Sequence, residues 1–127
     1  MKQPQVLIIA KEKSLSEGIA SLLISLPSVG NVGLARGHAE ALLWAETNEP
    51  DLVILDMSTC TLDLLEEIRS RHPDMKNLVL VDGMREQTRA QVAGADVALI
   101  TGYPADDLFK TVKALVAFDI PGKETED

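Results

Sequence analysis

The chain has 127 residues and a formal net charge of −8 at pH 7, with 12 Lys and Arg against 20 Asp and Glu. This length predicts one domain, which can bury roughly two thirds of its unfolded surface without disulfides or a metal. The acidic balance opposes contact with a phosphate backbone, so nucleic acid is not an expected direct partner. Cys60 is the single cysteine, and no apolar run is long enough for a signal peptide or a membrane span. We therefore expect a cytoplasmic protein that has no internal disulfide and no contact with membranes.

Short apolar runs alternate with segments of helical periodicity along the chain. The runs begin at Val6, Val29, Leu52, Leu78 and Val97. Each run is too short for a helix and is followed by a helical segment, a pattern typical of βαβ units. The sequence therefore predicts an α/β fold with a doubly wound, five-stranded parallel sheet.

The first helix has the clearest boundaries. Ser14 and Glu17 have the spacing of a capping box, and Pro27 ends the helical pattern. The apolar stripe of this helix consists of Leu15, Ile19, Leu22, Leu23 and Leu26. We expect the stripe to pack on the sheet.

The second strand is expected over residues 29–35. Its two glycines, Gly30 and Gly33, are typical of an edge strand or of a strand with a bulge. A second helix is expected over residues 38–48, before Pro50. Its inward positions are Ala41, Leu42 and Ala45.

The remaining elements continue the alternation. They are a strand that ends at Asp56, a helix over 62–71, a strand over 78–81, a helix over 86–93, a strand over 97–100 and a helix over 105–118. Gly94 is the expected C-terminal cap of the fourth helix. Residues 119–127 are acidic and without periodicity. We expect a single domain over residues 1–118, followed by a tail or the stub of a linker.

The third strand carries the most informative residue. Pro50-Asp51-Leu52-Val53-Ile54-Leu55-Asp56 is an almost continuous apolar run that ends in a carboxylate, as in a buried parallel strand with an acid at its carboxyl end. Ligands gather at this edge of open α/β sheets, so Asp56 is the candidate functional acid. The loops expected to join it there are 10–12, 82–83 and 101–102. The alternative is a carboxylate that only caps the following loop.

At these positions the chain resembles the CheY-like receiver domain of response regulators, especially the NarL-like branch. The resemblance covers about residues 5–118. It rests on the strand 6–9, the strand 50–56, Asp63 seven residues after Asp56, and the segment Ala93-Gly94-Ala95-Asp96. It implies a flavodoxin/CheY-like (βα)5 fold with strand order 2-1-3-4-5 and a part in two-component phosphorelay signalling. It also places Asp56 at the phosphoacceptor position.

Several residues depart from the pattern that the resemblance implies. Active receivers hold Mg²⁺ with an acidic pair after the first strand, and Ala10 and Lys11 stand at those positions. Asp82 replaces the hydroxyl residue that binds the phosphoryl group, and Thr101 replaces the family lysine. Glu12 compensates only if the loop shifts by one residue. Because Mg²⁺ needs several oxygen ligands, we expect no bound metal and no cofactor, and we interpret the domain as a degenerate pseudo-receiver.

Charge supports the same interpretation. A phosphoryl group adds nearly two negative charges, and a carboxylate at Asp82 would repel a like charge ~4 Å away by about 4 kcal/mol at a surface-like dielectric. We expect Lys11 to pair with Asp56, with Asp82 or with both. A solvated lysine in the loop is the simpler alternative. The family's aromatic switch position is occupied by Ala98.

Taken together, these residues predict a domain that is not an enzyme and that works through phosphorylation-independent contacts with signalling proteins. The partner would be a histidine kinase or an output domain, and a homodimer is left open. The resemblance implies contacts through the fourth helix, fifth strand and fifth helix, or through the first and fifth helices. The candidate contact residues are Met84, Arg89, Tyr103, Phe109, Lys113 and Phe118.

Two alternatives remain open at the sequence level. The first is a phosphorylatable receiver in which Asp56 accepts a phosphoryl group from a histidine kinase. The second is a small-ligand-binding or hydrolytic α/β domain that uses Asp56 and Asp82 in the same crevice.

Overall fold

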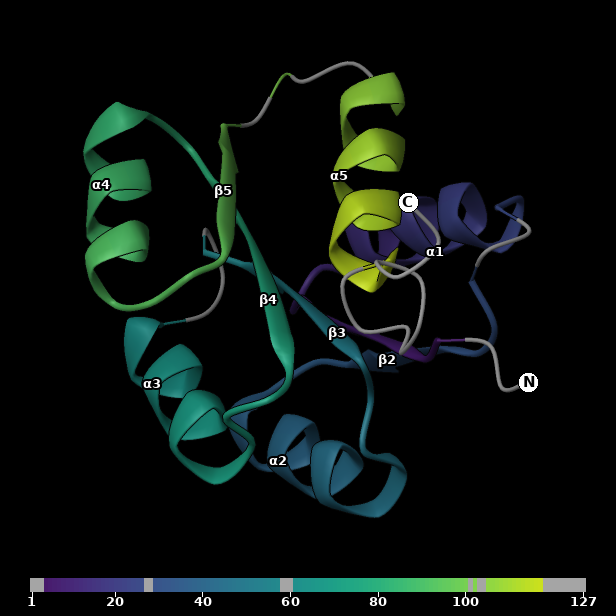
Figure 1. The fold of residues 1–127 in the computed structure, drawn as a ribbon, viewed down its shortest axis with the longest axis horizontal. Helices are drawn as coiled ribbons and strands as arrows, with labels where there is room; N and C mark the ends of the chain where they lie inside the picture. Colours follow the sequence, from purple (N-terminus) through teal and green to yellow (C-terminus); the bar gives the residue numbers. More distant parts are fainter. Residues whose placement is uncertain (1–3, 27–28, 58–60, 101, 103–104, 118–127) are drawn as a thin grey trace, which may run out of the picture.

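A computed structural model describes residues 4–26, 29–57, 61–100, 102 and 105–117. Within these residues five strands alternate with five helices (Figure 1). The strands are Val6–Ile9 (β1), Val32–Ala35 (β2), Leu52–Asp56 (β3), Lys76–Val81 (β4) and Val97–Ile100 (β5). The helices are Lys13–Ile24 (α1), His38–Asn48 (α2), Leu62–Arg71 (α3), Met84–Val92 (α4) and Ala105–Ala117 (α5).

The strands form one parallel sheet in the order β2-β1-β3-β4-β5. The predicted α/β fold and its strand order are thereby confirmed. Each crossover between neighbouring parallel strands runs through a helix, as the alternation in the sequence requires. Among the described residues, no helix is long and apolar enough to cross a membrane.

The sheet separates two apolar cores. Side chains of successive strand residues point to opposite faces, so Val6 and Ile8 join one core while Leu7 and Ile9 join the other. The first core lies under α1 and α5, and the second lies under α2, α3 and α4 (Figure 1). Both faces of β3 are covered, which explains why its sequence is a continuous apolar run rather than an alternating one.

The predicted edge position of the second strand is confirmed, but the strand is shorter than predicted. β2 begins at Val32 rather than at residue 29 because its pairing with β1 starts with Val32 opposite Val6. Ahead of it, the Val29 N–H donates to Leu26 O and the Gly30 N–H donates to Pro4 O. Gly33 has a packing role, since a Cβ atom there would overlap the ring of Trp44 on α2. The absence of a side chain at position 33 therefore lets α2 approach the sheet.

The first helix begins two residues earlier than the capping box predicted. Its N-cap is Glu12, in an extended conformation and without a side-chain cap hydrogen bond, so Ser14 lies inside the first turn. The predicted inward stripe is confirmed at Ile19 and Leu23, which are buried, whereas Leu22 is 36% exposed. Boundaries of this kind depend on local hydrogen bonds that periodicity does not specify.

Two elements near the other edge of the sheet also differ from the predicted bounds. β4 begins at Lys76 rather than at residue 78, because Lys76 still pairs with Leu52 of β3. α4 spans Met84–Val92 rather than 86–93, with Gly83 as its N-cap. Gly94 follows α4 with φ +109°, as predicted for a C-terminal cap. α5 ends at Ala117 in the described structure, and Phe118 and residues 119–127 lie outside it.

Candidate functional site

The sheet places the candidate acid beside the loop that follows β1. β1 and β3 are in parallel register with Ile9 opposite Leu55, so the next pair along the two strands is Ala10 and Asp56. Asp56 is only 3% exposed, and it pairs with Leu80 of β4 on its other side. The carboxylate therefore lies at the carboxyl end of the sheet, as predicted, but it is held in an almost fully buried position.

The loop after β1 offers Asp56 a methyl group where the family pattern has an acid. Ala10 is fully buried, and its N–H donates to Ala35 O at 3.0 Å. Lys11 and Glu12 are exposed, and Glu12 is the N-cap of α1. The loop is thus anchored on β2 by Ala10.

The loops after β4 and β5 contribute less to the described site. Asp82 directly follows Val81 at the end of β4 and is exposed. Thr101 lies outside the described residues, although Ile100 pairs with Val81 in the sheet. The structure thus brings Ala10 beside Asp56 and puts Asp82 on the neighbouring strand, while the predicted part of Thr101 stays a prediction.

Several ion pairs lie on the helices. They join Lys13 to Glu17, His38 to Glu67, and Arg71 to both Glu46 and Glu67. The predicted pairing of Lys11 with Asp56 or Asp82 stays a prediction.

The residues present do not fit the magnesium site that the family pattern implies. In the part of the chain that the structure describes, no group of three or more His, Cys, Asp or Glu side chains could hold a metal ion. Ala10 follows β1 at the level at which Asp56 ends β3, and Lys11 comes next in the chain. Neither side chain offers the oxygen ligands that a hard divalent cation requires.

The comparisons with known proteins agree with the fold. No protein-family model matches the chain. The response regulator MprA of Mycobacterium avium (strain 104) is 30% identical over 128 residues, an alignment that covers 96% of this chain and 55% of that protein. MprA of Mycolicibacterium vanbaalenii is 32% identical over 123 residues, which cover 92% of this chain and 52% of that protein. Over nearly its whole length the chain is thus similar to response regulators.

Solved structures support the same assignment at the level of the fold. The receiver domain of the Francisella response regulator 1452 superposes on 93% of this chain with a TM-score of 0.81 and 20% sequence identity, and all of that chain is covered. The chain thus spans about half the length of the curated relatives it matches and all of a solved receiver structure. The prediction of a CheY-like fold is confirmed at this level.

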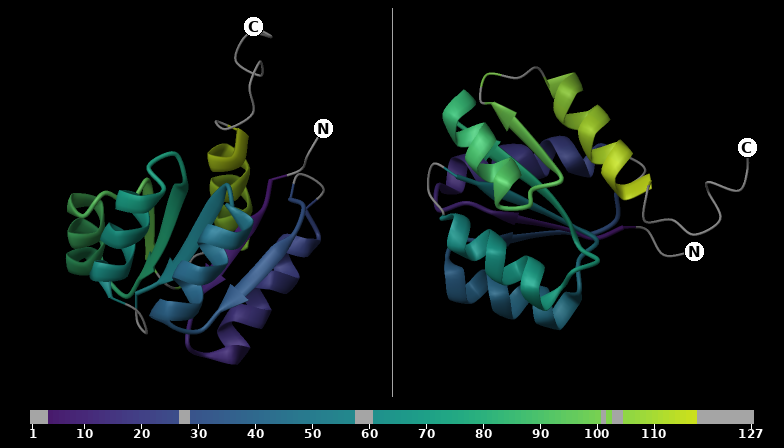
Figure 2. Two further views of the ribbon diagram at one scale, coloured as in Figure 1. Left: turned by 90° about the horizontal axis from the view of Figure 1, so that it is seen from below. Right: turned by 60° about the vertical axis from the view of Figure 1, so that its left-hand side comes forward.

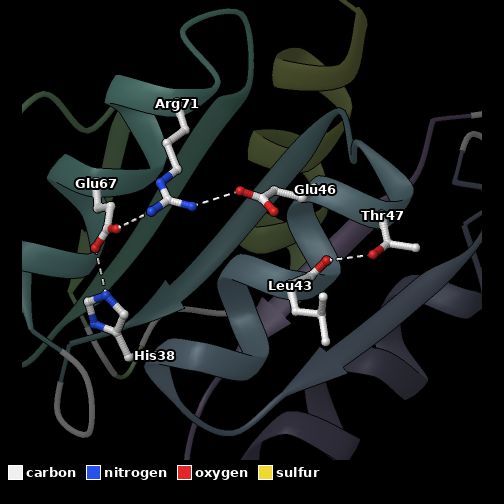
Figure 3. Close-up of polar contacts among 6 residues, drawn as sticks. All are labelled: His38, Leu43, Glu46, Thr47, Glu67 and Arg71. Atoms are coloured by element: carbon white, nitrogen blue, oxygen red, sulfur yellow. Dashed lines mark hydrogen bonds and ion pairs between the residues drawn. The ribbon is translucent and has the colours of Figure 1, made fainter.

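One polar cluster on the receiver domain was not predicted from the sequence. His38 on α2 bonds Glu67 on α3 at 2.7 Å, and Arg71 bridges Glu67 at 2.9 Å and Glu46 at 2.7 Å (Figure 3). The hydrogen bond from His38 and the charge of Arg71 hold the pKa of Glu67 below its ordinary value of 4.5. Glu67 and Arg71 are four residues apart on α3, a spacing from which an ion pair within the helix can be predicted. Their links to α2 depend on the helices lying side by side, as they do in Figure 2.

A second unpredicted contact ties α4 to the edge of the sheet. The Gln87 side-chain amide donates to Ala98 O at 2.8 Å. Ala98, which occupies the family's aromatic switch position, is 4% exposed. An edge strand leaves backbone groups unpaired, and Gln87 satisfies one of them on β5.

Proposed function

We propose that this receiver domain is a pseudo-receiver of the NarL-like branch, which acts through phosphorylation-independent contacts with signalling proteins. The observation that carries the proposal is the register of β1 and β3, which sets the Ala10 methyl group beside the buried Asp56. The position where an active receiver supplies a metal-binding oxygen is therefore apolar here. We further propose that the domain needs no cofactor and performs no catalysis.

Electrostatics supports this proposal. A phosphoryl group on Asp56 would bring nearly two negative charges into a position that is 97% covered by protein. Burying charge is costly, and Asp82, which follows the neighbouring strand, adds a like charge. Lys11, one residue beyond Ala10, is the nearest cation along the loop and offsets part of this repulsion. A phosphoryl adduct on Asp56 is thus disfavoured.

The output of the domain would come from a surface that already has its active shape. On α4, Met84 is 76% exposed and Arg89 is exposed, while on α5 Lys113 is exposed and Phe109 is partly buried. Tyr103 and Phe118 lie outside the described residues. We propose that a histidine kinase, an output domain or a second copy of the domain docks on this face. Four exposed or half-exposed side chains supply the apolar and cationic groups for such a contact.

A phosphorylatable receiver is the second candidate function. It is favoured by the position of Asp56, a carboxylate at the carboxyl end of the central strand, where the receiver fold has its phosphoacceptor. The two candidates differ in one measurable property, the response of Asp56 to Mg²⁺ and a phosphoryl donor.

The decisive experiment adds acetyl phosphate, or beryllofluoride, with Mg²⁺ to the ¹⁵N-labelled domain. We expect no covalent phosphoryl adduct in the intact mass and no Mg²⁺-dependent shift of the amide signals of Asp56 and Met57. A labile acyl phosphate, or Mg²⁺-dependent shifts that disappear in Asp56→Asn, would establish the phosphorylatable alternative.

A variant that regains the acidic pair, compared with a control variant, tests the role of positions 10 and 11. The double substitution Ala10→Asp with Lys11→Asp restores the acidic pair, and we expect it to confer Mg²⁺-dependent shifts at Asp56. The substitution Lys13→Asp changes a nearby exposed charge without adding an oxygen at the site. It should leave the domain unresponsive to Mg²⁺, and an equal response in both variants would contradict the assigned role of positions 10 and 11.

A further inference from the structure

β2 is an edge strand of the sheet, and one side of its backbone faces no other strand among the described residues. The Ala10 N–H donates to Ala35 O, so Ala35 faces β1. Gly33 faces β1 as well, because alternate residues of a paired strand bond the same neighbour. Val32 and Leu34 therefore direct their N–H and C=O groups away from the sheet. Such an edge is a template for pairing with another chain.

Bonds at both ends of β2 limit the open backbone groups to these two residues. Ahead of the strand, the Gly30 N–H already donates to Pro4 O at 2.8 Å. After the strand, the Arg36 N–H already donates to Glu40 Oε1 at 2.9 Å. A strand that is added at this edge would thus find its free donors only at the two outward-facing residues between these points.

The side chains along this edge do not oppose pairing. Edge strands are commonly protected by charged residues or proline, and residues 29–35 contain neither. Leu34 is 39% exposed, and it lies on the same face as Val32, which packs against the core under α1 and α5. Leu22 on α1, a helix that packs against β2, is exposed too. An added strand would therefore cover apolar side chains as well as satisfy backbone groups.

We propose that β2 pairs with β2 of a second copy of the chain, antiparallel and with the two-fold axis at Gly33. This arrangement sets Val32 of each copy opposite Leu34 of the other, and each such pair exchanges both of its hydrogen bonds. An axis at Val32 or at Leu34 would instead oppose one outward residue to position 30 or 36, whose N–H groups are already bonded. The edge is complementary to itself in one register, which makes a second copy the fitting occupant.

Trp44 lies beside the proposed axis. Its ring covers Gly33 so closely that a Cβ atom there would overlap it, and the ring is half-buried. In the paired sheet the two Trp44 rings would lie on one face, on either side of the axis, where aromatic rings can pair favourably. The fluorescence of Trp44 should therefore respond to the pairing.

The charge of the chain sets the salt dependence of this contact. Each copy has a net charge of −8, so two copies repel each other at long range. Salt screens this repulsion, and we expect the dimer to tighten as ionic strength rises. A contact with a basic partner would weaken instead. β2 lies at the opposite edge of the sheet from β5, so the pairing does not use Asp56 and does not rest on the proposed function.

The test combines sedimentation with amide hydrogen exchange over a dilution series of the domain, without Mg²⁺ or a phosphoryl donor. We expect a monomer–dimer equilibrium that shifts toward the dimer with concentration and with added sodium chloride. The Val32 and Leu34 amides should exchange more slowly in the dimer, while the Gly33 and Ala35 amides, already bonded to β1, should change little. Mixed labelled and unlabelled copies should show an intermolecular contact between Gly33 Cα protons, since these Cα atoms would lie about 4.5 Å apart.

Variants then assign the dimer to this edge. Leu34→Lys should raise the dissociation constant about tenfold or more, because its ammonium would lose water without gaining a partner. Leu34→Pro removes one outward N–H and keeps the bonds of Gly33 and Ala35 to β1, so it should weaken the dimer as well. The unfolding midpoint of each variant shows whether it is folded. Val92→Lys, at an exposed side chain on α4, is the control and should leave the dissociation constant unchanged.

Three outcomes would overturn the proposal. The first is a domain that stays monomeric at the highest concentration and ionic strength. The second is a dimer in which the exchange of the Val32 and Leu34 amides is not slowed relative to that of Gly33 and Ala35. The third is an effect of Val92→Lys as large as that of Leu34→Lys, which would place the contact on α4 instead.

Discussion

At the scale of single residues, the contacts of a side chain, rather than its type, decide its effect on the domain. Gly33 and Gly18 show this for the smallest residue. A Cβ atom at Gly33 would overlap the Trp44 ring, whereas a Cβ atom at Gly18 on α1 would have no neighbouring atom within 4 Å. Gly33 is therefore required by packing, and Gly18 is not.

We expect opposite effects on stability from the two alanine substitutions. Gly33→Ala should lower the free energy of unfolding by about 1–3 kcal/mol, the usual cost of overpacking. Gly18→Ala should raise it by about 0.5–1 kcal/mol, because glycine costs helical entropy. Urea denaturation of both variants measures the difference. If Gly33→Ala proved neutral, Trp44 would not be fixed against β2.

Glu67 gives a pH-dependent prediction at the same scale. Its folded pKa is lowered, so it contributes stability that is present above its ordinary pKa of 4.5 and is lost as the pH falls through the lower folded value. Glu67→Gln should therefore be less stable than the unsubstituted domain near pH 6, and the difference should shrink below about pH 4.5. Urea midpoints between pH 3 and pH 7 measure it, with Glu66→Gln as the control. A difference that is constant with pH would contradict the role of the carboxylate.

At the scale of elements, α4 is held to the sheet by a polar contact as well as by packing. Ala90 is fully buried against the sheet, and Gln87 bonds Ala98 O from one turn earlier. Gly94, with φ +109°, turns the chain from α4 toward β5, and its lack of a Cβ leaves space for the Arg69 side chain. The position of α4, which carries part of the proposed docking face, thus depends on backbone contacts of β5 and on α3.

We expect Gln87→Leu to loosen α4. Losing a hydrogen bond to a part-buried carbonyl should cost about 0.5–1.5 kcal/mol. Amide hydrogen exchange should accelerate in α4 and β5 more than in α2, because only those elements share the contact. Thr88→Ala, at an exposed position on the same helix, is the control and should leave exchange unchanged. Equal exchange in both variants would show that packing alone positions α4.

At the scale of the whole molecule, one sheet couples two cores. β1, β3 and β4 contribute side chains to both faces, so the loss of packing on either face is transmitted through shared backbone. Leu65 belongs to the core under α2, α3 and α4, and Leu108 belongs to the core under α1 and α5. Both residues are fully buried.

We therefore expect Leu65→Ala and Leu108→Ala to cost similar amounts, about 2–5 kcal/mol each, and to keep one cooperative transition. Far-ultraviolet circular dichroism and Trp44 fluorescence should report the same midpoint in each variant. Val92→Ala, at a side chain that is 83% exposed, should change the midpoint little. Separate midpoints for the two probes would show that the cores unfold independently.

The sequence by itself determined the fold, the bounds of several elements and the position of the candidate acid. α2, α3 and β5 have the predicted limits, and β3 ends at Asp56 as predicted, because apolar periodicity and turn residues act locally. The bounds of β2 and β4 depended on pairing with strands that are distant in the sequence. Only the tertiary structure linked His38 to Glu67 and assembled a cavity from residues 49–51 and 71–75. These arrangements depend on the register of strands and on the packing of helices, which sequence spacing does not encode.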